Sequence, residues 1–216
     1  MMNILLVAAT SMEVQSSIDY KKYHPIKEKN IDVLITGVGL VQTTYYLTQY
    51  LQHTKPDIVI QAGIAGLLSE QYALTDVVWI YQDFFADMAV TEDNTFKDIF
   101  DLNLCAANDY PFHNKALINP NKNILNILTL PQAIGISVNE ITTQSERIQH
   151  YQKKYHADVE SMEGAALHYV CLQQRIPFLQ IRSISNRVGV RDKTKWKMKE
   201  AIENLNKKII ETIELL

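Results

Sequence analysis

Asn3-Ile4-Leu5-Leu6-Val7-Ala8-Ala9 is a continuous apolar run, and it leads directly into Thr10-Ser11-Met12-Glu13. An apolar run of this length, without polar alternation, is typical of a strand buried on both faces in a parallel or mixed sheet. The spacing of Thr10 and Glu13 is that of a helix capping box, so a helix should begin at this point. A buried strand followed at once by a helix indicates an α/β fold.

The same pattern recurs along the chain. Residues 31–35 and 58–61 are apolar runs, followed by Gly37-Val38-Gly39 and Gly63-Ile64-Ala65-Gly66, which predict glycine turns. Further strands are predicted at 77–81, 133–138 and 178–185, helices at 41–51, 119–130 and 195–216, and a polar helix or turn at 144–155. This alternation predicts a three-layer α/β/α sandwich with a central twisted mixed β-sheet, formed by one domain of residues 1–216.

Residues 84–110 break this alternation, because they are acidic, aromatic and irregular. They predict a long excursion over the surface, and such excursions often bind ligands.

Composition narrows the class of protein. The 216 residues are 47% hydrophobic and 21% charged, with a formal net charge of -3, which argues against a nucleic-acid partner. The apolar run at the start of the chain is too short to span a bilayer and has no basic flank, so no membrane association is predicted. Cys105 and Cys171 are far apart in sequence, which favours a reduced, cytoplasmic protein.

Metal and cofactor motifs are not found in the sequence. The six histidines form neither H-E-x-x-H nor a Cys/His pattern, and there is no G-x-S-x-G motif. Gly37 and Gly39 begin a partial dinucleotide fingerprint, but Gln42 stands at its third glycine, so a tight turn is favoured over a cofactor site. We therefore predict no metal and no cofactor.

Three polar residues fall at strand ends or helix starts, where open α/β sheets place their sites. Glu163 precedes Gly164-Ala165-Ala166; it either lies near the core and needs hydrogen-bond partners, or faces solvent in a first helical turn. Local evidence favours the capping box as the explanation of Glu13, and a turn that its own amide stabilises as the explanation of Asn186. These local alternatives stay open.

Taken together, several segments resemble the nucleoside phosphorylase and nucleosidase superfamily, in the order of that family. The carriers are residues 9–14, Ile35-Thr36-Gly37-Val38-Gly39, Gln61-Ala62-Gly63-Ile64-Ala65-Gly66, Met162-Glu163 and Arg182-Ser183-Ile184-Ser185-Asn186. Within the superfamily the chain looks most like the futalosine hydrolases, on residues 160–166, 85–102 and 185–196. Methylthioadenosine/S-adenosylhomocysteine nucleosidases are the next class that it resembles.

The resemblance implies a purine nucleoside as the small-molecule substrate, and assembly of identical subunits as a dimer or tetramer. Glu13 would deprotonate the attacking water, Glu163 would accept hydrogen bonds from the ribose hydroxyls, and Asn186 would hold the departing base. Further substrate contacts are expected from Gly63, Ile64, Val138, Ile141, Met162 and Arg191.

Two departures from the superfamily narrow the expected reaction. Relatives that act on adenine carry an aspartate at the position of Asn186, whose amide can instead donate hydrogen bonds to N7 or O6 of hypoxanthine. Phosphorylases of the superfamily hold phosphate with arginines, one of which stands at the position of Gln61. The glutamine in this chain therefore favours hydrolysis over phosphorolysis. If the substrate is futalosine, its 5′ aromatic carboxylate would meet either residues 84–100 or the basic side chains of Arg187, Arg191 and Lys193.

Overall fold

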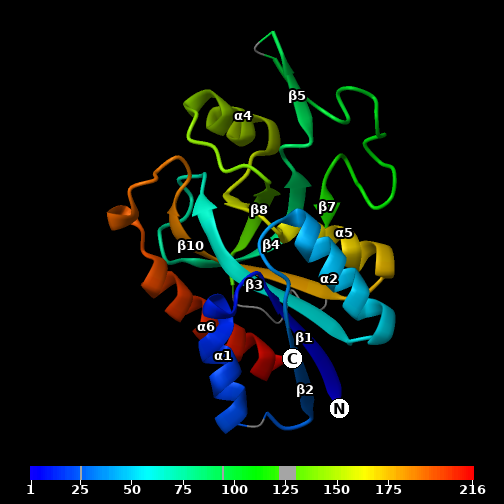
Figure 1. The fold of residues 1–216 in the computed structure, drawn as a ribbon, viewed down its shortest axis with the longest axis vertical. Coiled ribbons are helices and arrows are strands. Elements are labelled where there is room, and N and C mark those ends of the chain that lie inside the picture. The colour runs from blue at the N-terminus through cyan, green and yellow to red at the C-terminus, as the bar shows by residue number, and fades with distance from the viewer. Residues whose placement is uncertain (25, 94, 122–129) are drawn as a thin grey trace.

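In the computed structural model, which describes residues 1–24, 26–93, 95–121 and 130–216, a mixed sheet is flanked by helices (Figure 1). The sheet consists of β1 (Met2–Ala8), β2 (Lys29–Ile35), β3 (Ile58–Leu67), β4 (Val77–Phe85), β7 (Leu117–Ile118), β8 (Gln132–Ser137), β9 (Val159–Ser161) and β10 (Phe178–Arg187). The α-helices are α1 (Ser11–Tyr23), α2 (Leu40–His53), α4 (Ser145–Tyr155), α5 (Gly164–Gln174) and α6 (Met198–Leu215). The predicted α/β class with a central mixed sheet is confirmed.

The strand β1 is buried on both faces, as its apolar run predicts. Ile4 and Leu6 belong to a cluster with apolar side chains of α1 and α6. Leu5 and Val7 project from the opposite face and pack with side chains of α2 and α5. Successive side chains of a strand alternate between the faces, so a run without polar residues needs a helical layer on each side.

Part of the sheet closes on itself, which the predicted open sandwich did not include. β3 pairs with β9 and with β10, β10 pairs with β4, β4 with β8, and β8 with β9. These five strands therefore form a ring, and they share one buried cluster made of Ala65, Leu67, Val78, Ile80, Ala133, Val159 and Ile184. The ring fixes the ends of β3, β9 and β10 next to one another.

Two predicted turns are in fact strand. The segment 63–66 continues β3, because β10 pairs with it through Gly66 and β9 pairs with Gly66 from the other side. The short strand β9 was not predicted, since its three residues directly precede α5 and resemble the start of that helix. Asn186 lies within β10, at an irregularity of its pairing with β3, and not in a turn after the strand.

The remaining boundaries differ more locally. The region 84–110 contains a hairpin of β5 (Ala89–Glu92) and β6 (Thr95–Asp98), and is therefore not wholly irregular. The last helix begins at Met198, after a short 3-10 turn η1 (Lys193–Lys195), so Trp196 precedes it. The helix predicted at 119–130 falls mostly outside the described residues.

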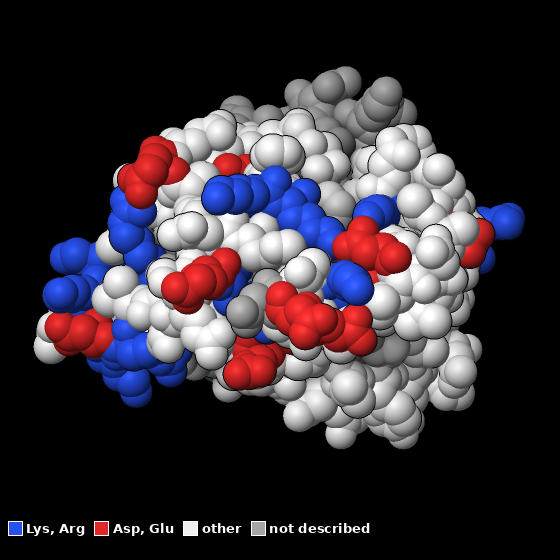
Figure 2. All heavy atoms as spheres, turned by 90° about the horizontal axis from the view of Figure 1, so that it is seen from above, with Lys and Arg blue, Asp and Glu red and all other residues white. Residues whose placement is uncertain are grey.

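Charged side chains of both signs are interspersed on the face seen from above (Figure 2). That face shows no extended basic surface among the residues described. Of the helices that the structure describes, none is long and apolar enough to cross a membrane.

Candidate active site

A cavity of about 240 Å³ lies where α1, β3, β9 and β10 meet. Seven of the nine predicted site residues line it, namely Glu13, Ile64, Ile141, Met162, Glu163, Asn186 and Arg191. The sequence reasoning did not name the other lining residues as site residues: Ala9, Thr10, Met12, Val38, Ala65, Gly66, Glu160, Ser161, Ser185, Val188, Gly189, Val190 and Trp196. Six separate segments of the chain thus converge on one cavity: residues 9–13, Val38, 64–66, Ile141, 160–163 and 185–196.

Two predicted contact residues do not line the cavity. Val138 is fully buried in an apolar cluster with Phe84, Ile136 and Tyr151, so its side chain packs toward α4 and not toward the cavity. Gly63 lies behind the wall: a Cβ atom there would be 2.5 Å from Arg182 Nη1 and 2.9 Å from Glu13 Oε1. Glycine at this position lets both charged groups approach β3.

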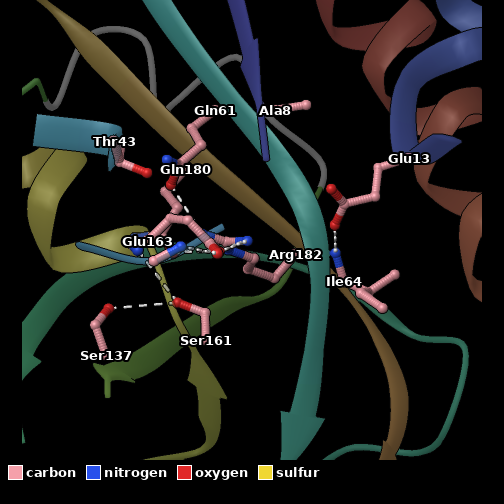
Figure 3. A network of polar contacts seen from close by, with 12 residues as sticks. Ala8, Glu13, Thr43, Gln61, Ile64, Ser137, Ser161, Glu163, Gln180 and Arg182 are labelled. Carbon is pink, nitrogen blue, oxygen red and sulfur yellow. Dashed lines mark hydrogen bonds and ion pairs between the residues drawn. The ribbon is translucent and has the colours of Figure 1, made fainter. Parts of the chain in front are cut away.

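Glu13 forms the helix-capping contact and also lines the cavity, so its capping role and a position in the site do not exclude each other. Its Oε2 atom accepts hydrogen bonds from the Thr10 N–H and the Thr10 hydroxyl, each at 3.0 Å, which is a helix-capping contact. Its Oε1 atom accepts from the N–H of Ile64 at 3.0 Å (Figure 3). The side chain is 6% exposed and lines the cavity. The cap therefore holds this carboxylate at the cavity wall.

Glu163 is the N-cap residue of α5 and is buried, at 6% exposure, so the solvent-facing alternative is wrong. Its Oε1 atom accepts a hydrogen bond from the N–H of Gly39 at 3.1 Å. Its Oε2 atom lies 3.4 Å from Nη1 of Arg182. The protein thus already supplies partners for the buried charge.

Arg182 was not predicted as a site residue, although it adjoins both carboxylates. It is 2% exposed; its Nε donates to Gln180 at 3.0 Å, and its Nη2 donates to Gln61 Oε1 at 2.8 Å. A buried guanidinium needs partners of this kind. The signal available in the sequence was a charged side chain in the middle of the strand predicted at 178–185.

A buried polar network extends from Arg182 to the start of α5 (Figure 3). Gln180 donates to Asp83 at 3.0 Å, and Ser137 donates to the other oxygen of Asp83 at 3.0 Å. The N–H of Ala165 donates to the Ser137 hydroxyl at 2.7 Å. Burial raises the pKa of Asp83 to about 6, against the lowering effects of its hydrogen bonds and of Arg182. This network fixes the beginning of α5, and with it Glu163.

Asn186 also lines the cavity and is half-buried. Its Oδ1 atom accepts from the Ser185 hydroxyl at 2.8 Å, and its Nδ2 atom donates to the carbonyl of Arg187 at 3.0 Å. The local stabilising role suggested by the sequence is therefore present. One N–H of the amide remains for a ligand.

The three basic residues proposed for the 5′ substituent are placed differently. Arg191 lines the cavity, and its guanidinium carbon is 5.4 Å from the ring centre of Trp196. Arg187 is paired with Glu70 at 2.7 and 2.9 Å, and Lys193 is not in the cavity wall. Of these three, only Arg191 is in a position to meet a ligand.

No cluster of three or more His, Cys, Asp or Glu side chains suited to a metal ion occurs among the described residues.

Known proteins similar to this chain are nucleosidases. A futalosine hydrolase from Thermus thermophilus is 26% identical over 174 residues, which cover 80% of this chain and 76% of that protein. Two Helicobacter pylori structures, a 5′-methylthioadenosine/S-adenosyl homocysteine nucleosidase and a futalosine hydrolase, each match with a TM-score of 0.82 at 16% identity. Both matches cover 100% of this chain, and 99% and 98% of the respective structures. At this identity they establish the fold and do not choose between the two activities.

A family model assigns the chain more broadly. The model of the Phosphorylase superfamily matches residues 20–215, and Glu13 precedes this region. Since the match spans nearly all of the 216 residues, the chain belongs to the Phosphorylase superfamily.

Proposed function

We propose that the protein is a futalosine hydrolase, which hydrolyses the N-glycosidic bond of futalosine and releases hypoxanthine and dehypoxanthine futalosine in menaquinone biosynthesis. The observation that carries this proposal is the convergence of Glu13, Glu163 and Asn186 on one cavity. Cleavage of a purine from ribose needs a base for water, partners for the sugar hydroxyls and a donor for the leaving group. The similarity to the Thermus thermophilus enzyme supports this substrate.

Glu13 is the proposed general base. Its three hydrogen-bond donors among the described residues, Thr10 N–H, Thr10 hydroxyl and Ile64 N–H, are all neutral. A carboxylate fixed in this way can orient a water molecule and accept its proton as the glycosidic bond breaks. General-base catalysis contributes roughly 10²- to 10⁴-fold to such a reaction.

Glu163 is the proposed partner of the ribose 2′- and 3′-hydroxyls, with Met162 packing on the sugar. The Gly39 N–H and Arg182 hold the Glu163 carboxylate, and an ionised carboxylate has further acceptor sites for two hydroxyls. The free N–H of the Asn186 amide donates to N7 or O6 of the departing hypoxanthine. An adenine base would present an amino donor to this amide, and such mispairing costs roughly 1–3 kcal/mol.

Water, and not phosphate, is the proposed nucleophile. The described cavity wall contains three carboxylates and a single basic side chain, Arg191, which is exposed. The guanidinium of Arg182 is already engaged by Glu163, Gln61 and Gln180. A buried phosphate dianion would lie among like charges without a free cationic partner, whereas water needs none.

We also propose that identical subunits assemble through the outer face of α2. Val41, Tyr45 and Tyr46 of this helix are exposed, and a hollow of about 700 Å³ lies between α2 and Phe85, Met88 and Asn139. Exposed apolar patches of this kind mark protein interfaces. We propose that this dimer or tetramer forms in the cytoplasm. The Val41→Lys variant should dissociate it, and light scattering coupled to size-exclusion chromatography measures the mass. An unchanged mass would exclude this surface as the subunit interface.

The activity is tested by incubating the purified protein with futalosine, inosine and methylthioadenosine, with and without phosphate, and following free base. We expect futalosine to be cleaved fastest, at a rate that does not depend on phosphate. A preference for methylthioadenosine would identify a methylthioadenosine nucleosidase, and a strict need for phosphate would identify a purine nucleoside phosphorylase. Either result would reject the proposed function.

A further inference from the structure

Glu160 is a buried acid in the cavity wall that none of the roles above uses. It lies in the short strand β9 and is 7% exposed. Its Oε2 atom is buried, and no hydrogen-bond partner for this atom occurs among the described residues. Burial, together with the nearby charge of Asp87, raises the pKa of Glu160 to about 7. An unpartnered buried carboxyl group is unfavourable, so this group is suited to a partner that arrives with a ligand.

The register of the sheet places Glu160 relative to Asn186. Gly66 of β3 is paired with Asn186 on one side and with Glu160 on the other. Residues opposite one another in neighbouring strands project from the same face, and adjacent strands are about 4.8 Å apart. The Asn186 and Glu160 side chains therefore flank Gly66 across roughly 10 Å, and both line the cavity.

Gly66 keeps the space between these side chains open. A Cβ atom at this position would lie 2.8 Å from Val188 Cγ2 and 3.7 Å from Asn186 Nδ2. A larger residue would therefore intrude on the groups that border the space. With glycine, a flat heterocycle can lie over β3, with one polar edge toward Asn186 and another toward Glu160.

We propose that Glu160 is a specificity-determining residue that accepts a hydrogen bond from N1–H of a 6-oxopurine base. This inference rests on the proposed function. It gives a protein partner to the edge of the leaving base that Asn186 does not contact. Asn186 donates to N7 or O6, which are both acceptors, and N1–H is left as a donor that needs an acceptor. In adenine N1 carries no hydrogen and is itself an acceptor. Above about pH 7, where Glu160 is ionised, a carboxylate facing it would leave both groups unpaired, so the site would reject the 6-amino base. The base preference is therefore measured at pH 8.

The test compares base preference in Glu160→Gln, Glu160→Ala and the wild type, using inosine and adenosine. A glutamine amide can accept from N1–H or donate to an unprotonated N1. We therefore expect the ratio of kcat/KM for inosine over adenosine to fall about tenfold or more in Glu160→Gln, mostly through faster adenosine cleavage. Glu160→Ala should lose about tenfold or more on inosine and should cleave adenosine faster than the wild type, because the unpaired carboxylate is gone.

Inosine methylated at N1 provides a measurement that does not depend on a polar replacement at position 160. The methyl group removes the N1 donor and adds bulk, so the wild type should cleave this compound at least about tenfold more slowly than inosine. Glu160→Ala removes the acceptor and makes room, and should reduce that discrimination. Because each comparison is a ratio within one enzyme preparation, partial misfolding of a variant does not change it.

Glu140→Gln is the matched control, since Glu140 is an exposed carboxylate on the neighbouring segment and does not line the cavity. It should keep the wild-type ratios. If both Glu160 variants also keep the wild-type base preference, and the wild type tolerates the N1-methyl group, Glu160 is not a base contact. The proposed hydrolase would stand in that case, because wild-type cleavage of futalosine tests it separately.

Discussion

Two buried carboxylates, Glu13 and Glu163, approach β3 from different helices and differ in what holds them (Figure 3). Glu13 accepts hydrogen bonds from three neutral donors. Glu163 accepts one neutral hydrogen bond, from Gly39, and lies against the Arg182 guanidinium. Glu13 is thus fixed by hydrogen bonds alone, and Glu163 by a hydrogen bond together with an ion pair.

Besides Glu163, a second buried acid, Asp83, belongs to the polar network around Arg182. When ionised, Glu163 and Asp83 together carry two negative charges against the single positive charge of Arg182. Asp83 is linked to Arg182 through Gln180, and burial raises the pKa of Asp83 to about 6 although these hydrogen bonds and Arg182 lower it. The Glu13 side of β3 contains no such network in the described structure.

The largest effect is expected from Glu13→Gln. If Glu13 is the base, kcat should fall by roughly 10²- to 10⁴-fold, with a much smaller change in KM. The glutamine NH₂ group must also face one of the N–H donors that now point at a carboxylate oxygen. The free energy of unfolding should therefore fall by about 1–3 kcal/mol. Single-turnover kinetics and urea denaturation check the two quantities; a kcat within tenfold of wild type would leave Glu13 with only its capping role.

Arg182→Met is expected to act mainly on stability. It removes the cation that compensates Glu163 and leaves the side-chain oxygens of Gln61 and Gln180 without their donor. Removing one partner of a buried ion pair typically lowers the free energy of unfolding by about 3–5 kcal/mol.

Arg182→Lys is the matched control for this change. It keeps the charge while losing the planar fork of donors, so it should lie between wild type and Arg182→Met in urea denaturation. If methionine is tolerated as well as lysine, the Glu163 side does not depend on a cation. The contrast with Glu13 would then fail.

The sequence was sufficient where one local pattern fixed one structural outcome. The apolar run of β1 required helices on both faces, and the capping box located both the start of α1 and the Glu13 carboxylate. The resemblance to a family placed seven of nine predicted residues at one cavity, although Glu13 precedes the matched region.

Features that depend on pairing between distant strands were not predictable in this way. Closure of the ring, the extension of β3 through Gly66 and the short strand β9 all arise from partners far away in sequence. Arg182 was missed for the same reason, because its acceptors come from β3, β10 and the start of α5. Val138 was expected to contact the substrate. A side chain at the end of a strand can project from either face of the sheet, and that of Val138 packs against α4 instead.

A smaller effect is expected from Asp83→Asn, and it depends on pH. Burial raises the pKa of Asp83 from 3.8 to about 6 in the folded protein. The resulting stabilisation is fully present below pH 3.8 and is lost as the pH rises through 6. The wild type should therefore lose up to about 3 kcal/mol relative to Asp83→Asn across this window.

Urea denaturation at a series of pH values measures this difference. Glu160 also has a raised pKa, but it titrates in both proteins and cancels in the comparison. Asp19→Asn, which changes an exposed acid, should show no such trend. A constant difference between wild type and Asp83→Asn would mean that Asp83 stays ionised, fully compensated by Arg182.

The smallest change concerns the Glu13 side, through Thr10→Val. This variant removes the hydroxyl that donates to Glu13 but keeps the shape of the side chain and the backbone N–H. We expect a loss of about 1 kcal/mol in the free energy of unfolding and a fall in kcat of about two- to tenfold, since the two remaining donors still orient the carboxylate. Thr10→Ser retains the hydroxyl and should behave as wild type in both assays. A fall of two orders of magnitude in kcat would show that the Thr10 hydroxyl itself contacts the water or the substrate. The Glu13 carboxylate keeps two of its three donors in this variant, so a change in its orientation cannot account for so large an effect.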